Sequence, residues 1–365
     1  KILMNDNATP SLTPNTSSAA SPWRFCVAPM LDWTDRPCRF FERLLTRRGR
    51  LYTEMVTTGA IRFGNRDALL GNCRVAGPTA LQLGGSDPKE LAFAVEAAAL
   101  YGYDEFNLNC GCPSPRVQKG SFGACLMLDA KLVAECVRAM RDATDKPVTV
   151  KHRIGVDERS DYGFVRDFVG EVYDAGCRTF IVHARAAWLQ GLSPKENREV
   201  PPLMRSRAWE LKRDFPDAVI VLNGAVKTTA ECRALLDEVH DGVRIDGVMV
   251  GRAAYQTPWM LSEVDSVLYG ESCRTLTREA VIAAVEAEAE QYYAADEHVI
   301  RAFARHLNGF RAHARGAERL RIRRSSRLKA PNSTAEPGVR RSARIFDGDA
   351  WPALEVKKNL RHRPL

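Results

Sequence analysis

The chain has no long run of apolar residues and no closely paired cysteines. No stretch approaches the roughly 18 consecutive apolar residues of a membrane-spanning helix, which argues against a membrane protein. Ten cysteines are scattered over 365 residues, and none forms the C-x-x-C pair typical of structural zinc sites. The first 22 residues, rich in Ser, Thr, Asn and Pro, lack the apolar core of a secretory signal. We therefore expect a cytoplasmic protein with reduced thiols, no metal, and a disordered leader over residues 1–22.

A G-x-G-x-x-G turn is also missing after the first predicted strand, which ends in Ala28-Pro29-Met30, and this argues against a doubly wound nucleotide-binding fold. Short apolar runs rich in β-formers instead alternate with helical patterns. They cover residues 24–30, 51–56, 79–84, 105–111, 148–155, 179–185, 219–224 and 247–252. Strand–helix alternation implies parallel strands, and this number of units matches one closed barrel. We therefore predict an α/β fold, a (β/α)8 TIM barrel over residues 23–270.

Positive charge is concentrated near the C-terminal end of the sequence. Residues 301–365 hold 17 Lys and Arg against 5 Asp and Glu, whereas residues 1–300 hold 36 against 40. A long helical pattern over 277–295, with Thr277 as its N-cap, precedes a basic stretch interleaved with Phe and Leu. This pattern favours a small basic helical domain over 275–328 that binds nucleic acid, rather than a solvated charged tail. Residues 329–365 show no periodicity and predict a disordered or atypical tail.

Polar and small residues gather where the predicted strands end, which is where working side chains lie in such barrels. The set comprises Pro29, Met30, Gln82, Asn109, Cys112, Lys151, Arg153, His183, Arg185, Asn223, Gly224, Ala225, Gly251 and Arg252. The small residues after the last two strands would let backbone N–H groups approach a phosphate. A cation at the barrel mouth would stabilise an anionic reduced flavin ring. Each of these residues, taken alone, could equally have a structural role, but together they favour a barrel that binds FMN over an empty barrel.

Cys112 differs from the other cysteines in its surroundings. It follows a predicted strand, precedes a proline that restricts the turn, and opens a loop of Gly, Ser and Lys. A buried, inert thiol is the ordinary reading of a lone cysteine. The loop position instead favours an accessible thiol that donates a proton as a general acid.

The motifs together resemble the tRNA-dihydrouridine synthases, specifically their A subfamily. APMLDWTDRPCRFF, ALQLGGSDP, NLNCGCPSPRVQKGSFGACLM, VTVKHRIG and HARAAWLQGLSPKENREVPPL carry the resemblance, which covers about residues 24–320. It implies an oxidoreductase with tightly bound FMN, reduced by NADPH or NADH. The substrate would be a D-loop uridine of tRNA, of the 20/20a type, flipped into the barrel mouth.

The resemblance also implies roles for individual residues. Reduced FMN would give a hydride to C6 of the uracil, and Cys112 would protonate C5. The flavin would be held by Pro29, Met30, Gln82, Lys151, His183, Asn223, Gly224, Ala225, Gly251 and Arg252. Substrate and tRNA contacts would come from Asn109, Arg185, Lys195, Asn197, Arg198, Arg305 and Arg321. The expected partner is tRNA, bound by a monomer, with neither a membrane nor DNA involved.

Two alternatives stay open at this point. The first is an FMN barrel that reduces a free small molecule, such as a pyrimidine or an enone, and it leaves the basic C-terminal segment unexplained. The second is a non-catalytic RNA-binding or RNA-folding protein on a barrel scaffold, and it leaves Cys112 and the strand-end residues unexplained.

Overall fold

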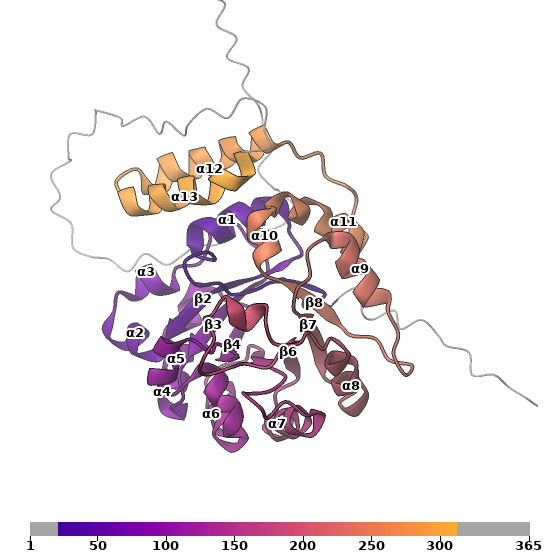
Figure 1. Ribbon diagram of the computed structural model, residues 1–365. Helices are drawn as coiled ribbons and strands as arrows, with labels where there is room; N and C mark the ends of the chain where they lie inside the picture. The colour runs from indigo at the N-terminus through magenta and orange to yellow at the C-terminus, as the bar shows by residue number, and fades with distance from the viewer. Residues whose placement is uncertain (1–20, 312–365) are drawn as a thin grey trace, which may run out of the picture.

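The structure, a computed structural model, describes residues 21–311 (Figure 1). Eight parallel strands close into a barrel in sequence order. They are β1 (Phe25–Val27), β2 (Arg50–Thr57), β3 (Thr79–Gly84), β4 (Glu105–Cys110), β5 (Val148–Arg153), β6 (Thr179–His183), β7 (Val219–Asn223) and β8 (Gly247–Val250). Cys26 of β1 pairs with Met249 of β8, which closes the ring. The predicted (β/α)8 barrel is confirmed.

Helices surround the barrel as an outer layer (Figure 1). The longer ones are α1 (Arg36–Leu45), α4 (Pro88–Ala98), α6 (Ala130–Asp142), α7 (Tyr162–Asp174), α8 (Ser206–Asp214) and α9 (Thr229–Asp237). Most begin after an Asp or Thr whose side chain accepts a hydrogen bond from a backbone N–H of the first turn; these caps are Asp35, Asp87, Asp129, Asp161 and Thr228. The caps explain why the helices start abruptly after the strand-end loops, which leaves those loops free to build a site.

Short helices lie within the connecting loops. They are α2 (Thr58–Phe63), α3 (Arg66–Leu70), η2 (Ala99–Tyr101), α5 (Pro115–Lys119), η3 (Gly123–Leu128), η4 (Glu196–Arg198), α10 (Arg252–Gln256), η5 (Pro258–Glu263) and α11 (Val264–Tyr269). At this length they gain most of their stability from tertiary packing rather than from helix propensity. They shape the loops above the ends of β2, β4, β6 and β8.

The core has two parts with different chemistry. A large apolar layer lies between the strands and the outer helices. A smaller cluster fills the barrel lumen, built from Cys26, Ala28, Tyr52, Ala80, Ile181, Val221 and Met249. The lumen also contains the buried carboxylate of Glu105, which pairs with Arg50 at 3.0 Å and accepts hydrogen bonds from Tyr52 and Trp23. A buried charge is tolerated only when paired and hydrogen-bonded, so this network holds the closed end of the lumen in one arrangement.

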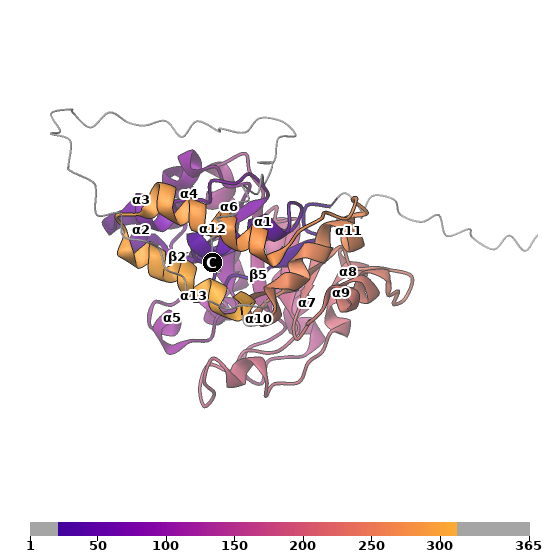
Figure 2. The same ribbon diagram turned by 90° about the horizontal axis from the view of Figure 1, so that it is seen from above.

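Two C-terminal helices pack against each other and against α1: α12 (Arg278–Tyr293) and α13 (Glu297–Arg311), side by side in Figures 1 and 2. Thr277 caps α12, as the sequence predicts. Phe303 and Phe310 of α13 meet Phe40 and Phe41 of α1 edge to face, with centroids 6.0 and 5.0 Å apart. These rings attach the helical pair to the side of the barrel.

Polar contacts complete this junction. The ring Nε2 of His306 donates to the Asp35 carboxylate at 2.8 Å, and Arg305 pairs with the same carboxylate at 2.9 Å. The predicted helical segment is therefore present as far as residue 311. The predicted contact residue Arg321, the tail over 329–365 and nearly all of the leader lie outside the described residues. The domain boundaries at 275 and 328 stay predictions.

Within residues 21–311, no helix is long and apolar enough to cross a membrane. The same part of the chain holds no group of three or more His, Cys, Asp or Glu side chains arranged to bind a metal ion. The ten cysteines, all within it, are unpaired thiols.

Candidate active site

A chain of carboxamides leads from the lumen to the barrel mouth. On β4, residues at every second position face inward, and Asn109 is the outermost of them. Asn109 donates to Gln82 at 2.8 Å, and Gln82 donates to Asn107 at 2.7 Å. Asn107 then donates to Thr149, whose hydroxyl donates to the buried Glu105. Because each amide is oriented by the next, Gln82 and Asn109 present their remaining polar atoms at the mouth in one fixed direction.

Sequence reasoning found Gln82 and Asn109 but missed Asn107 and Glu105. A signal was present: in EFNLNC, polar residues recur at every second position of a strand that is otherwise apolar. In a barrel strand that alternation places all three polar side chains in the lumen.

The loop that carries Cys112 is attached to the same amide. The Asn109 side-chain oxygen accepts from the backbone N–H groups of Gly111 and Cys112, each at 3.1 Å. The Cys112 carbonyl accepts from Ala124 at 2.9 Å. The thiol is only partly buried and its Sγ lies 3.5 Å from the hydroxyl of Ser114. The loop therefore holds an accessible thiol at the end of β4. Cys110, two residues earlier, has a different environment.

Cys110 is fully buried in the layer between strands and helices. Burial raises the pKa of the Cys110 thiol well above its ordinary value. Because the protonated form dominates and no solvent reaches it, this thiol is a core residue.

Two basic residues, Lys151 on β5 and His183 on β6, lie at the ends of neighbouring strands of the mouth. Lys151 donates to the Asn223 side-chain oxygen at 3.2 Å, and His183 lies on the neighbouring strand, paired in register with Arg153 and Asn223. Burial, and then the nearby Arg153, lowers the pKa of Lys151 to about 7. Burial and several cationic neighbours lower the pKa of His183 well below its ordinary value. The mouth is electropositive, and a partner that is anionic or electron-rich would stabilise the charged form of Lys151.

The backbone after β7 is shaped for close approach. Gly224 and Ala225 both have positive φ, 139° and 53°, in a region that side-chain-bearing residues rarely adopt. A Cβ at Gly224 would lie 3.0 Å from Leu203. On the neighbouring strand, Gly251 begins the turn from β8 into α10, where a Cβ would meet Ala28 and Met30 at 3.7 and 3.9 Å. Strained backbone of this kind is concentrated at ligand sites, and here it forms a cradle of bare backbone between β7 and β8.

The donor set fits FMN. A phosphate matches the small residues after β7 and β8, and an electron-rich ring matches the basic pair in the mouth. Arg252 is the exception among the predicted flavin residues: its guanidinium pairs with Glu199 at 2.6 Å near the surface.

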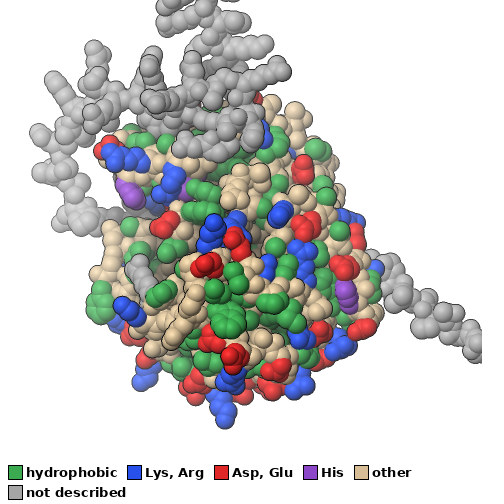
Figure 3. Space-filling model, viewed as in Figure 1, with side chains coloured by type: hydrophobic (Ala, Val, Ile, Leu, Met, Phe, Trp, Pro, Cys, Tyr) green, Lys and Arg blue, Asp and Glu red, His purple; other side chains and the backbone are tan. Residues whose placement is uncertain are grey.

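The residues predicted to contact RNA occupy different depths. Lys195, Arg198 and Arg305 are exposed, and Arg185 is partly buried and donates to the carbonyl of Pro201. Figure 3 shows Lys and Arg side chains both on the C-terminal helices and on the barrel below them. This face can therefore meet a polyanion at several points.

Asn197 is placed differently from its prediction. It is fully buried, and its carboxamide bonds both the N–H and the carbonyl of Trp188, at 2.7 and 2.9 Å. A direct contact with RNA is unavailable to it in this arrangement. Asn197 instead fixes the loop on which Trp188, 38% exposed, stands out to solvent.

Arg153, which the sequence places at the end of the fifth strand, is a site residue to which no role was predicted. It is 3% exposed, and it donates to the carbonyls of Gly111 and Asn197 at 3.1 and 3.0 Å. Gln118 makes a second link, because its amide donates to Pro113 and Leu189. The Cys112 loop and the 185–198 loop are thus joined by two side chains. The alternation of Lys151 and Arg153 along β5 places Arg153 at the mouth, but its two carbonyl partners follow only from the packing of the loops.

A parallel (β/α)8 barrel with a backbone cradle after its last strands, a basic mouth and an accessible thiol defines a barrel enzyme whose mouth fits a phosphate-bearing cofactor. The comparisons with known proteins give the particular family. The model of the dihydrouridine synthase family matches residues 26–338. The chain belongs to this family.

Curated relatives agree. A tRNA-dihydrouridine(20/20a) synthase of Pseudomonas putida is 55% identical over 271 residues, 74% of this chain and 79% of that protein. The protein of the same name from Pseudomonas aeruginosa is 51% identical over 311 residues, 84% of this chain and 91% of that protein. A Salmonella typhimurium relative, also so named, is 53% identical over 276 residues, 75% of this chain and 81% of its own length.

Proposed function

We propose that this chain is a flavin-dependent tRNA-dihydrouridine synthase that reduces the C5–C6 double bond of a D-loop uridine of the 20/20a type. The observation that carries the proposal is the position of Cys112. Its thiol lies on a loop at the end of β4, whose residue Asn109 binds the backbone of that loop and is paired in register with Lys151. Family membership and the names of relatives that the chain covers over most of their length support the same reaction.

The residues that would hold FMN are those around the cradle and the basic pair. Gly224, Ala225 and Gly251 would admit the phosphate, and Lys151, His183 and Gln82 would face the ring. Pro29, Met30, Asn223 and Arg252 complete the proposed set. FMN, when bound and reduced by NADPH or NADH, supplies the hydride that C6 of the uracil receives.

The remaining chemistry belongs to side chains of this protein. Asn109 binds the uracil edge with the amide hydrogen not used by Gln82, and Arg198 reaches it from the opposite loop. Cys112 donates the Sγ proton to C5 as C6 gains the hydride, so the double bond is lost and the charge balances. Solvent returns a proton to the exposed thiolate. Lys151 stays charged against the electron-rich ring and holds it in place.

The tRNA would be bound by the exposed cations around the mouth and on α13. Lys195, Arg185 and Arg305, together with Arg321 beyond the described residues, supply phosphate contacts that do not depend on sequence. Asn197 acts indirectly through the loop that it holds. A uridine must leave its stack to reach the barrel mouth, and these contacts offset the cost of unstacking.

The proposal is tested with the purified protein, NADPH and tRNA from a strain that lacks D-loop dihydrouridine at these positions. We expect dihydrouridine to form at position 20 or 20a, detected by reverse-transcription stops. Cys112→Ala should lose at least about 100-fold in rate while keeping its flavin spectrum, because general acids contribute about 10²–10⁴-fold.

Cys273→Ala, which removes an exposed thiol far from the mouth, is the matched control and should keep full activity. Absence of a bound flavin would overturn the proposal. Reduction of free uridine as fast as of tRNA would instead favour the small-molecule reductase, and unchanged activity in Cys112→Ala would contradict the assigned proton donor.

A further inference from the structure

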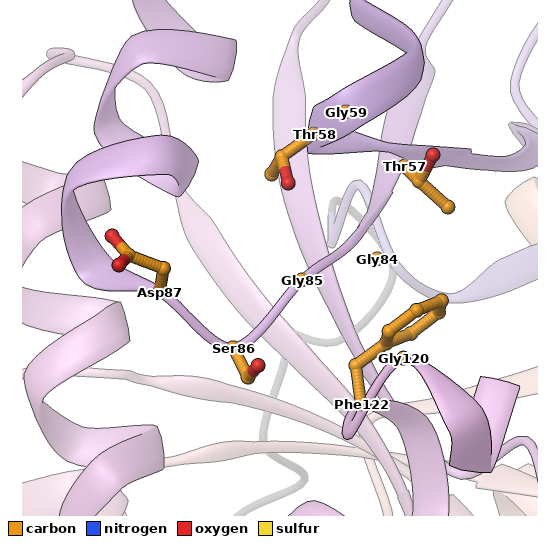
Figure 4. Close-up of a pocket in the computed structure, with 9 residues that line it drawn as sticks. All are labelled: Thr57, Thr58, Gly59, Gly84, Gly85, Ser86, Asp87, Gly120 and Phe122. Atoms are coloured by element: carbon orange, nitrogen blue, oxygen red, sulfur yellow. The ribbon is translucent and has the colours of Figure 1, made fainter.

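A second cavity lies beside the candidate active site, over the ends of β2 and β3 (Figure 4). It has a volume of about 370 Å³, within the range of small-molecule sites. Its walls are Thr57, Thr58 and Gly59 from β2 and α2, Gly84 to Asp87 from the β3–α4 turn, and Gly120 and Phe122 from the loop after α5. None of these residues belongs to the proposed flavin or uracil set.

The floor of this cavity is bare backbone. A Cβ at Gly85 would come within 2.9 Å of the Thr58 methyl group, and a Cβ at Gly84 within 2.9 Å of the Phe122 ring. A side chain at Gly120 would overlap the same ring. The glycines therefore let Thr58 and Phe122 pack directly against backbone, and any other residue at these positions would displace them from the cavity wall.

The polar groups at the cavity suit a neutral ligand. Figure 4 shows the Thr58 and Ser86 side chains reaching into the space opposite Phe122. Within the described part of the chain, neither hydroxyl takes part in an internal hydrogen bond, so each can donate to or accept from a ligand. The first N–H groups of α4 are already bound by the Asp87 carboxylate, at 2.8 and 3.0 Å. That carboxylate at the rim disfavours a phosphate.

The cavity is also close to the place where a uracil would enter. Gly84 follows Gln82 by two residues on β3, a rise of roughly 6.6 Å. Phe122 lies two residues before Ala124, whose N–H bonds the Cys112 carbonyl at 2.9 Å. The cavity therefore shares one strand and one loop with the proposed uracil site, at about the spacing of neighbouring nucleotides in an extended strand.

We propose that this cavity binds a nucleobase, namely that of the tRNA nucleotide next to the flipped uridine, between the Phe122 ring and the hydroxyls of Thr58 and Ser86. A flat aromatic face and two free hydroxyls match a base with its stacking face and polar edge. The proposal rests on the proposed function, since it takes the flipped uridine as its neighbour. The adenine of the reductant is the other source of the same chemistry, and the experiment separates the two.

The test uses the full-length, flavin-loaded enzyme. The double variant Thr58→Val with Ser86→Ala removes both hydroxyls with little change in volume, and Ser86→Phe fills the cavity. Loss of two hydrogen bonds should raise the Kd for tRNA, and lower kcat/KM, by about tenfold. Ser160→Ala, on the loop after β5, is the matched control and should match the wild type.

The Kd for tRNA and the kinetics of flavin reduction by NADPH show whether the base comes from tRNA or from the reductant. An increase in the Kd for tRNA, with flavin reduction by NADPH unchanged, supports the proposal as stated. An increase in the KM for NADPH alone shows that the cavity takes the adenine, and overturns the assignment to tRNA. Unchanged constants for both substrates overturn the nucleobase site.

A separate comparison shows whether the proposed function itself is wrong. In the same assay, wild-type enzyme must form dihydrouridine and Cys112→Ala must not, whatever the cavity variants do.

Discussion

Lys151 offers a quantitative test of the electrostatics in the barrel mouth. Among residues 21–311, the Asn223 oxygen is the hydrogen-bond acceptor of its amine, and burial, and then the nearby Arg153, lowers the pKa of Lys151 from 10.5 to about 7. At about 1.4 kcal/mol per pKa unit, this corresponds to as much as about 5 kcal/mol of destabilisation while Lys151 is charged in the flavin-free fold. Lys151→Met should therefore stabilise the flavin-free protein at pH 7 while abolishing turnover.

The sign of the pH dependence follows from proton binding. Between about pH 7 and 10.5 the unfolded chain keeps the Lys151 proton and the fold releases it, so unfolding takes up a proton and wild-type stability rises with pH through this contribution. Below about pH 7 both states are charged and the full penalty is present. The stability advantage of Lys151→Met should therefore shrink steadily from pH 7 to pH 10.

The assay is urea denaturation of flavin-free protein at several pH values, with Lys131→Met on the exposed face of α6 as the matched lysine control. The control should show no pH-dependent difference from the wild type. An advantage of Lys151→Met that does not change between pH 7 and pH 9.5 would refute the assignment of a buried, poorly compensated amine. Bound FMN should diminish the advantage, because it supplies the missing electron-rich partner.

Three further predictions test other parts of the structure. Arg153→Lys keeps the charge but loses the planar fork that joins two loops, so kcat should fall about 10- to 100-fold with the flavin retained, measured by turnover and absorbance; unchanged kcat would contradict the joining role. Arg50→Ala leaves the Glu105 carboxylate buried without its partner and should cost about 3–5 kcal/mol in urea denaturation, and a cost below about 1 kcal/mol would contradict it. Asp35→Asn should speed amide hydrogen exchange in α13. In the wild type, burial raises the Asp35 pKa, but the hydrogen bond from His306 outweighs it and holds that pKa below 3.8. The protection of α13 from exchange should therefore be present above pH 3.8 and should be lost as the pH falls through the pKa of Asp35 in the folded protein.

The repeating pattern of the sequence was sufficient for the barrel. The predicted strand at 51–56 is observed as Arg50–Thr57, and the predicted helix at 277–295 as Arg278–Tyr293. Such agreement is possible because strand and helix periodicities, and the capping residues between them, are local properties of the chain. The short helices α2 and α3 were missed, since segments of five or six residues carry too little periodicity to be recognised.

The strand ends and the family motifs predicted which polar residues lie at the mouth. They did not predict the hydrogen-bond and ion-pair partners of those residues. That Asn109 supports the Cys112 backbone, that Arg252 pairs with Glu199, and that Asn197 is buried under Trp188 depend on side chains from different strands meeting in space. No pattern along one strand specifies which neighbour a side chain contacts, because barrel closure brings distant segments together.

The sequence by itself determined the alternation of strands and helices, the basic character of the C-terminal segment and the place of a thiol on a loop before Pro113. These depend on local propensity and composition. Tertiary structure alone decided the amide chain from Glu105 to Asn109, the lowered pKa of Lys151 and the cavity beside Phe122. The physical reason is that burial, electrostatic environment and empty volume arise only when the barrel closes and its loops pack against one another.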